Sequence, residues 1–298
     1  MGSLRRERGS GAVAAVAGGL VSVLLTAVAG CSSPTAADDH PADDSAPGAA
    51  AALHRAADVL ARAGSSRVRT TVETASGGTR LSIRGTGAYD FAARQGRLRL
   101  VLPRDARGDE EHEPITELLV SGVLFMRNRG AGVPVDKWVR VDTAGIPDGN
   151  LVSGGATDPL AAAELLRGAR EVRAVGRERL GGAVVWHYWG TADIGRAARA
   201  ASPGVRGPLT AAATGFADGT VPFDAYLDSR GRLRAVRYRF AVANEWGGAG
   251  DGAPRTVSVV STAELYDFGA EADVQLPAPA DIYTGRVGAP RGRAAPDG

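Results

Sequence analysis

The chain of 298 residues contains a single cysteine, Cys31. A thiol can act as a nucleophile, bind a metal, form a disulfide or carry a covalent modification. Because there is no second cysteine, an intramolecular disulfide and a paired thiolate metal site are both excluded. The role of Cys31 therefore has to be understood from the residues around it.

The residues before Cys31 have the order of a secretory signal. Three arginines lie within the first eight residues, and residues 11–30 carry no charge and end in small side chains. A cationic segment followed by an apolar segment is typical of exported proteins. The apolar run is also long enough for a transmembrane anchor, although its Gly and Ala content favours a signal. The sequence thus predicts that residues 1–30 direct export.

The four residues that end at Cys31, Val28-Ala29-Gly30-Cys31, resemble the lipobox of bacterial lipoproteins. The resemblance implies that Cys31 becomes the first residue of the mature protein and carries acyl chains such as palmitate. Each buried methylene adds about 0.8 kcal/mol of membrane affinity, so two or three acyl chains anchor a protein durably. We expect a lipid anchor at Cys31, on the extracytoplasmic face of the cell membrane.

Other groups of chemically competent side chains lack the partners that a reaction needs. Residues 38–44 and 109–113 are rich in Asp, Glu and His, but a charged linker and a charged loop explain them better than metal sites do. His187 stands in a strand beside aromatic residues, where a structural role is commoner than a catalytic one. The tripeptide at 267–269 spells the kinase motif Asp-Phe-Gly without the other kinase motifs. The sequence predicts neither an enzyme nor a cofactor or metal site.

The charge balance argues against nucleic acid as a partner. The chain has 35 basic and 33 acidic residues, and the predicted signal holds three Arg and one Glu. The mature chain is therefore neutral overall, and no concentrated basic stripe remains. Nucleic-acid binding is disfavoured on this ground.

The composition divides the exported chain into a domain and two tails. Residues 31–48 and 285–298 are rich in Ala, Gly, Pro and Asp or Arg and have almost no large apolar side chains. Such segments cannot bury enough apolar surface to offset the entropy of ordering, so we expect a disordered tether and a disordered tail. Residues 49–284 remain as one domain.

Helical periodicity appears near the start and in the middle of this domain. A helix is predicted over 49–63, with Gly64 as its C-cap. Its apolar positions recur at helical spacing, and they are Leu53, Ala56, Ala57 and Leu60. A second helix is predicted over 158–168, with Asp158 as N-cap and Pro159 at the first helical position. Residues 194–218 have helical character interrupted by Gly and Pro.

Alternation of apolar and polar residues predicts strands over most of the rest. Leu98 and Leu100, for example, alternate with Arg97 and Arg99. An antiparallel sheet with one buried and one solvated face gives this pattern. The predicted fold class is α+β with one large antiparallel sheet. Its expected strands are 67–73, 80–87, 97–102, 115–120, 123–127, 138–141, 172–178, 184–190, 223–227, 233–242 and 257–265.

Five short segments of the domain form an ordered series. They are DKWVRVD (136–142), DPLAAAELL (158–166), VGRERLGGAVVWHYWGTAD (175–193), VPFDAYLDSRGRLRAVRYRF (221–240) and YDFGAEADVQLP (266–277). In this order they resemble actinobacterial lipoproteins of the LppX/LprG type, relatives of the periplasmic carrier LolA. The likeness covers about residues 53–282. This chain departs from the pattern at Tyr226, where Trp is expected, in a longer hairpin at 246–254, and in the Gly and Pro residues at 203–208.

The resemblance implies a strongly curved antiparallel sheet, a half-open barrel, with helices packed on its concave face. It also implies an apolar cavity there for the acyl chains of lipids or lipoglycans. The candidate lining residues are Leu60, Gly85, Trp186, Tyr188 and Ala225. The small residues either leave room for a ligand or let the sheet bend and the helices pack closely, and the aromatic residues either line the cavity or pack as core.

Two functional classes follow from this fold. The first is a membrane-anchored lipoprotein that binds or carries lipid or lipoglycan. The second is a structural or regulatory lipoprotein with a closed core that serves as a platform for a protein partner, whose identity the sequence does not give. The two classes differ in whether the interior accepts an acyl chain.

Overall fold

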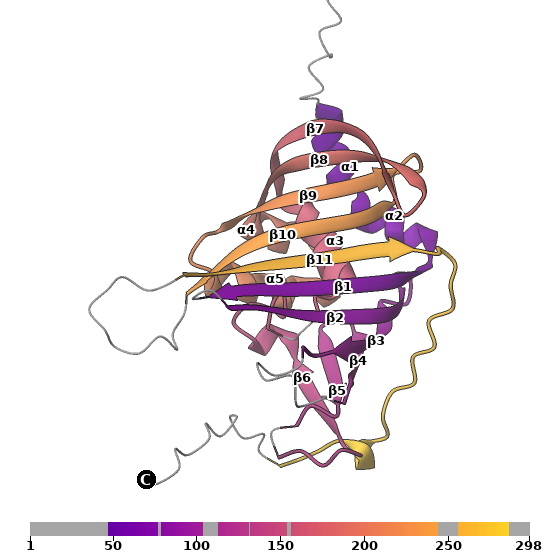
Figure 1. Cartoon of the computed structure of the whole chain (residues 1–298), viewed down its shortest axis with the longest axis vertical. Coiled ribbons are helices and arrows are strands. Elements are labelled where there is room, and N and C mark those ends of the chain that lie inside the picture. Colours follow the sequence, from indigo (N-terminus) through magenta and orange to yellow (C-terminus); the bar gives the residue numbers. More distant parts are fainter. Residues whose placement is uncertain are drawn as a thin grey trace, which may run out of the picture. The chain divides into compact units, whose positions relative to one another are not determined.

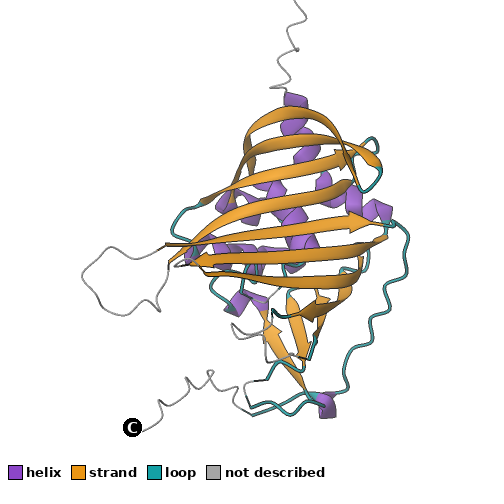
Figure 2. Cartoon of the chain, in the orientation of Figure 1, coloured by secondary structure: helices purple, strands orange, loops and turns teal. Residues whose placement is uncertain are grey.

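The computed structural model describes residues 47–76, 79–103, 113–130, 132–153, 156–243 and 256–285. These residues form one antiparallel sheet and a set of helices that the sheet curves around (Figures 1 and 2). Cys31, the predicted signal 1–30, nearly all of the predicted tether and tail, and most of the acidic loop 109–113 lie outside the described residues.

The sheet has 11 strands in the order β6-β5-β4-β3-β2-β1-β11-β10-β9-β8-β7. It consists of two meanders, β1 to β6 and β7 to β11, which the pairing of β1 with β11 joins into one sheet. Edge strands β6 and β7 end the order, so the sheet is open. The strands are β1 Ser65–Ser76, β2 Thr79–Asp90, β3 Gln95–Val101, β4 Ile115–Val120, β5 Val123–Arg127, β6 Trp138–Asp142, β7 Ala169–Leu180, β8 Ala183–Asp193, β9 Thr220–Asp228, β10 Leu233–Ala243 and β11 Thr256–Tyr266.

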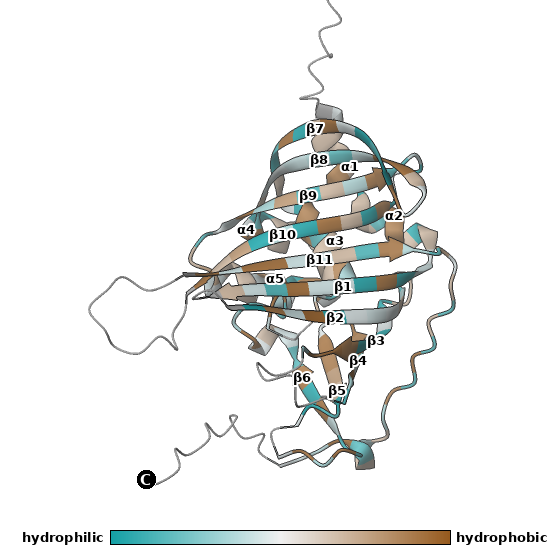
Figure 3. Ribbon diagram, in the orientation of Figure 1, coloured by the Kyte–Doolittle hydropathy of each residue, from teal (hydrophilic) through white to brown (hydrophobic). Residues whose placement is uncertain are grey.

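Alternating burial explains why these segments form strands. In β3, Leu98 and Leu100 are buried while Arg97 and Arg99 are exposed. Hydropathy alternates in the same way along the neighbouring strands (Figure 3). The concave face therefore carries the apolar residues toward the helices, and the convex face carries arginines into water, as the sequence predicts. The prediction of an α+β fold with a curved antiparallel sheet is confirmed.

Tight turns join the strands of the meanders. Ser121 and Gly122, both with positive φ, connect β4 to β5. At the predicted turn between β9 and β10, the amide of Gly231 donates a hydrogen bond of 2.8 Å to the carbonyl oxygen of Asp228. The Asp228 carboxylate also accepts a hydrogen bond from the amide of Arg230, so both the backbone carbonyl and the side chain of Asp228 stabilise this turn.

The helices lie on the concave side of the sheet (Figure 1). They are α1 Pro47–His54, α2 Ala56–Ala63, α3 Pro159–Leu165, α4 Ile194–Ala200 and α5 Pro203–Gly215, with 3-10 turns η1 Thr143–Gly145, η2 Leu166–Gly168 and η3 Pro279–Asp281. The predicted single helix over 49–63 is in fact two helices. The amide of Arg55 bonds to the carbonyl oxygen of Ala52, a tighter turn that interrupts the α-helical ladder there.

The C-terminal end of α2 and the N-terminal end of α3 are formed by the capping residues that the sequence predicts. Gly64 follows α2 with φ of +84°, a conformation that favours glycine. The Asp158 carboxylate accepts hydrogen bonds of 2.7 and 3.3 Å from the amides of Leu160 and Ala161, and Pro159 occupies the first position of α3. Ala201 and Ser202 separate α4 from α5. The Gly and Pro residues at 203–208 lie within α5, where Pro203 takes the first helical position and Pro208 lies in the interior.

Candidate functional site: the concave face and its helices

One row of paired positions crosses the concave face of the sheet and contains three of the predicted cavity residues. Directly paired residues in an antiparallel sheet lie on the same face, so the row can be followed from strand to strand. It runs Tyr188–Ala225–Val236–Ala263–Thr70–Gly85–Leu100. Small side chains occupy much of this row, as the sequence predicts. Trp186 lies on the same face of β8, two residues from Tyr188.

Buried side chains of the helices cover this row. They include Leu60 of α2 and three consecutive alanines of α3, Ala161 to Ala163. The hydroxyl of Tyr238, which points inward from β10, donates a 2.8 Å hydrogen bond to the carbonyl oxygen of Ala162. This bond ties α3 to the middle of the sheet.

The space above the sheet glycines is occupied in this structure. A Cβ added to Gly85 would meet the hydroxyl of Thr70, and it would lie 2.7 Å from a methyl carbon of Leu100. At Gly87 a Cβ would meet the backbone carbonyl of Arg97. These two glycines therefore permit close packing of strands β1 to β3, one of the two roles considered for them. The use of Gly85 as a lipid contact stays a prediction.

The two aromatic residues of β8 lie at the margin of the core. Tyr188 is half-buried and packs against the core. Trp186 is half-buried as well, and the guanidinium of Arg177 lies over its ring at 4.4 Å from the centroid. Ala225 is fully buried between β8 and β10. Of the five predicted residues, Leu60, Gly85 and Ala225 are therefore buried, whereas Tyr188 and Trp186 are half-buried.

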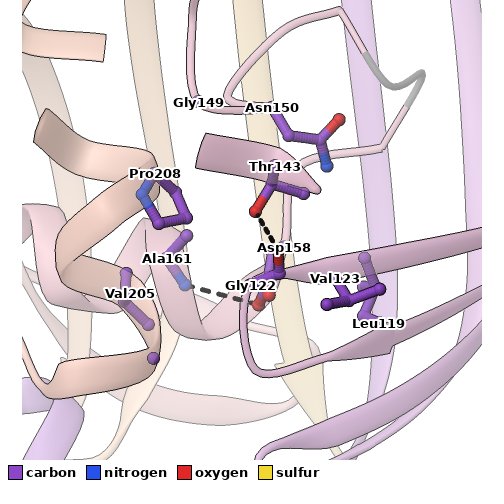
Figure 4. Close-up of a pocket in the computed structure, with 11 residues that line it drawn as sticks. Leu119, Gly122, Val123, Thr143, Gly149, Asn150, Asp158, Ala161, Val205 and Pro208 are labelled. Atoms are coloured by element: carbon purple, nitrogen blue, oxygen red, sulfur yellow. Dashed lines mark hydrogen bonds between the residues drawn. The ribbon is translucent and has the colours of Figure 1, made fainter. Parts of the chain in front are cut away.

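A small cavity lies where the β4–β5 hairpin meets α3 and α5 (Figure 4). Its walls include Leu119, Asn150, Asp158 and Pro208. Beside it, the hydroxyl of Thr143 donates a 2.8 Å hydrogen bond to a backbone carbonyl of the β4–β5 turn. The cavity volume is about 10 Å³, which is room for about one water molecule. Sites for drug-sized ligands measure roughly 300–1,000 Å³, so an acyl chain needs the layers to separate.

The carboxyl group of Asp158 has a perturbed acidity. Burial raises the pKa of Asp158 to about 6, against the lowering effect of the two amide hydrogen bonds that it accepts. The nearby Tyr89 is also buried, and desolvation raises the pKa of its phenol well above the usual value. This helix N-cap therefore takes up a proton at a pH where most Asp side chains are still ionised.

Arg167 connects the helices of the concave layer. Its guanidinium lies 2.5 Å from Glu164 of α3 and 2.5 Å from Asp58 of α2. Glu164 is nearly fully buried, and its carboxylate also accepts a 3.3 Å hydrogen bond from the amide of Ser202. The hydrogen bond from Arg167 lowers the pKa of Asp58, which keeps the ion pair charged. One guanidinium thus links α2 to α3.

Two buried polar residues were not singled out from the sequence. Glu117 of β4 is fully buried on the concave face, and Asn150 is buried in the wall of the small cavity. Glu117 could have been found, because it occupies the inward phase of an otherwise apolar strand, between Ile115 and Leu119. Asn150 lies in a loop, where no periodicity marks burial.

Two further surface features lie outside this layer. Residues 144–147 and one side of α5 together line an open groove of about 820 Å³. On the other side of the sheet, both ring nitrogens of His187 have partners, Glu178 at 3.1 Å and Asp224 at 2.8 Å. His187 also stacks on Tyr226, so it is fixed in place by three neighbours.

Within the ranges that the structure describes, no helix is both long and apolar enough to cross a membrane. The same residues contain no group of three or more His, Cys, Asp or Glu side chains placed to hold a metal ion.

The fold, an open curved antiparallel sheet with helices on its concave face, is similar to that of several solved structures. LprF from Mycobacterium bovis is 14% identical, with 78% of this chain and 98% of that chain covered and a TM-score of 0.39. The lipoprotein LppX from Mycobacterium tuberculosis is 13% identical, with 76% and 99% covered and a TM-score of 0.37. A LolA superfamily protein from Nitrosomonas europaea is 11% identical, with 79% and 97% covered and a TM-score of 0.31.

These solved structures include proteins of the LppX type and of the LolA superfamily, the groups that the sequence motifs resemble. No protein-family model matches the chain, and no curated protein matches it.

Proposed function

We propose that this protein is an exported, non-enzymatic lipoprotein that is anchored through Cys31 and binds acyl chains of lipid or lipoglycan between the concave sheet face and the helices. The lipobox-like sequence before Cys31 supports the anchor. The ordered motifs of the sequence support the ligand class, and the apolar concave face supports the place of binding.

The observation that carries the proposal is the composition of the helix layer. Eight of the buried residues of helices α2 to α5 are alanines, and they are interspersed with larger apolar side chains, which include Leu60, Leu160, Leu165, Ile194, Val205 and Leu209. Hydrophobic stabilisation scales with the buried apolar area, at about 25 cal/mol per Å². The alanine positions therefore lose less contact energy than larger side chains would when the layer lifts, and an incoming acyl chain replaces that contact.

The small cavity beside the β4–β5 hairpin has a volume of only about 10 Å³, so the entry of an acyl chain there requires the helix layer to move. Discrete, reversible polar contacts hold the helices: the Tyr238–Ala162 hydrogen bond joins α3 to the sheet, and the Arg167 ion pairs join the turn after α3 to α2 and α3. A two-state layer of this kind binds ligand in its minor, open state.

The alternative is a closed-core platform for a protein partner. The occupied space above Gly85 and the cavity of only about 10 Å³ favour this second candidate. It predicts the same anchor and the same fold, but no lipid in the interior.

Native mass spectrometry of the mature domain, purified from envelope membranes under mild conditions, separates the two functions. Carrier function predicts a bound lipid that leaves only on denaturation, and hydrogen exchange in α2 and α3 that slows when lipid is bound. Lipid-free protein that also fails to take up added palmitate, with unchanged exchange in these helices, contradicts the carrier proposal and leaves the platform.

A further inference from the structure

Glu117 is a buried carboxyl group without a polar partner. Its side chain has no solvent exposure, and neither carboxyl oxygen makes a hydrogen bond. It pairs with Leu98 on β3 and with Met126 on β5. The inward neighbours on its own strand are Ile115 and Leu119, so four buried apolar side chains surround the carboxyl group.

An isolated buried carboxyl is unfavourable for folding, since desolvation is not offset by hydrogen bonds. Burial raises the pKa of Glu117 well above its usual value. The protonated form that is favoured here carries one O–H donor and one carbonyl acceptor, both unused. A hydrophobic residue of similar size would suit this position better, so the carboxyl group has no explanation in the stability of the closed fold.

A second buried group with unused hydrogen-bonding capacity, Asn150, lies in the wall of the small cavity, which an inward neighbour of Glu117 also lines. Leu119, the next inward residue after Glu117, lines the small cavity together with Asn150 (Figure 4). Asn150 is 2% exposed, and both its amide nitrogen and its amide oxygen lack partners. Asn150 has a φ of +65°, and the Asp148 carboxylate accepts hydrogen bonds from the backbone amides of Asn150 and Val152, which hold this loop in place.

We propose that Glu117 and Asn150 form a polar subsite for the hydroxyl groups of a neutral lipid head, whether these belong to a sugar or to glycerol. This inference rests on the proposed acyl-chain binding. Hydroxyl groups both donate and accept hydrogen bonds, which matches a protonated carboxyl and an amide. An anionic phosphate head is disfavoured, because the carboxyl of Asp158 lines the same cavity. The subsite then specifies which lipid the apolar layer accepts.

The test compares two probes with the same acyl chain, 1-monopalmitoylglycerol, which has two free hydroxyls, and methyl palmitate, which has none. Affinities are measured by displacement of a fluorescent fatty acid from the lipid-free mature chain. Wild type should prefer the monoglyceride by about tenfold, the effect expected of one well-made buried hydrogen bond. In Glu117→Leu this preference should fall to about twofold or less, while the melting temperature of the lipid-free protein rises.

Two further variants separate a ligand contact from a packing role. Glu117→Gln keeps a donor and an acceptor and should retain most of the preference. Leu118→Met changes volume little and lies on the opposite face of β4, so it should leave the preference intact.

Equal affinity of wild type for the two probes overturns this inference but leaves acyl-chain binding standing. A Glu117→Leu protein that is less stable than wild type and keeps its preference also overturns it. If wild type binds neither probe, the proposed function itself fails, and the inference fails with it.

Discussion

The guanidinium of Arg167 lies 2.5 Å from the carboxylate of Asp58, and this contact joins the turn after α3 to helix α2. The same guanidinium pairs with Glu164, whose side chain is 3% exposed. Three charges from two separate stretches of the chain thus hold α2 and α3 together. Because the proposed function requires this layer to open, the contact sets how readily it does so.

Arg167→Ala should destabilise the domain by about 3 kcal/mol, because it leaves the buried Glu164 carboxylate unpaired. Chemical denaturation of the mature chain measures the loss. Arg170→Ala is the matched control, since Arg170 pairs with Asp193 at the surface with a side chain 54% exposed. The control should lose at most about 1 kcal/mol. Equal losses in the two variants would show that Arg167 does not hold the layer.

Asp158→Asn should change how stability depends on pH. The pKa of Asp158 is about 6 in the fold, above its unfolded value of 3.8, so the folded state takes up a proton between these pH values. Wild type should therefore gain stability relative to Asp158→Asn as the pH falls from about 6.5 to 4. Asn caps a helix as well as Asp does, so the helix should survive the substitution.

Denaturant midpoints at pH 7, 5.5 and 4 measure the difference. Asp193→Asn, at the more exposed N-cap of α4, serves as the control variant. Parallel pH curves for wild type and Asp158→Asn would contradict the assignment of this titration to Asp158.

Gly85→Ala should destabilise the domain by about 1–3 kcal/mol, because the added methyl meets Thr70 and Leu100. Gly48→Ala is the control, and its expected effect on the stability of the domain has the opposite sign. Gly48 lies in α1 with nothing within 4 Å of its added Cβ, so alanine should stabilise the helix by up to about 1 kcal/mol. Thermal unfolding of the two variants measures both changes in stability. If Gly85→Ala is as stable as wild type, the interior is more open in solution than in the structure.

Cys31→Ala should abolish the incorporation of labelled palmitate, because the only thiol of the chain is then missing. The variant should appear in the soluble exported fraction or accumulate with its signal uncleaved. Labelling of cells followed by fractionation checks both outcomes. Equal palmitate incorporation by wild type and variant would rule out the lipid anchor at this position.

The sequence by itself determined the class of the fold and the identity of its faces. Alternation such as Arg97-Leu98-Arg99-Leu100 requires a strand with one dry side, whatever its neighbours are, because successive side chains point to opposite faces. Asp158-Pro159 likewise specifies a helix start through local hydrogen bonding and a fixed φ. These signals are contained within a few residues, so they can be seen without the fold.

Only the tertiary structure decided what the inward side chains meet. In the sequence, Gly85 is equally compatible with room for a ligand and with close packing of the strands. Which of the two roles it has depends on Thr70 and Leu100, which other strands supply. Glu117 lies in the inward phase of its strand, but its isolation follows from apolar neighbours on β3 and β5. Packing and polar satisfaction are set by contacts between distant segments, and no local pattern encodes those distances.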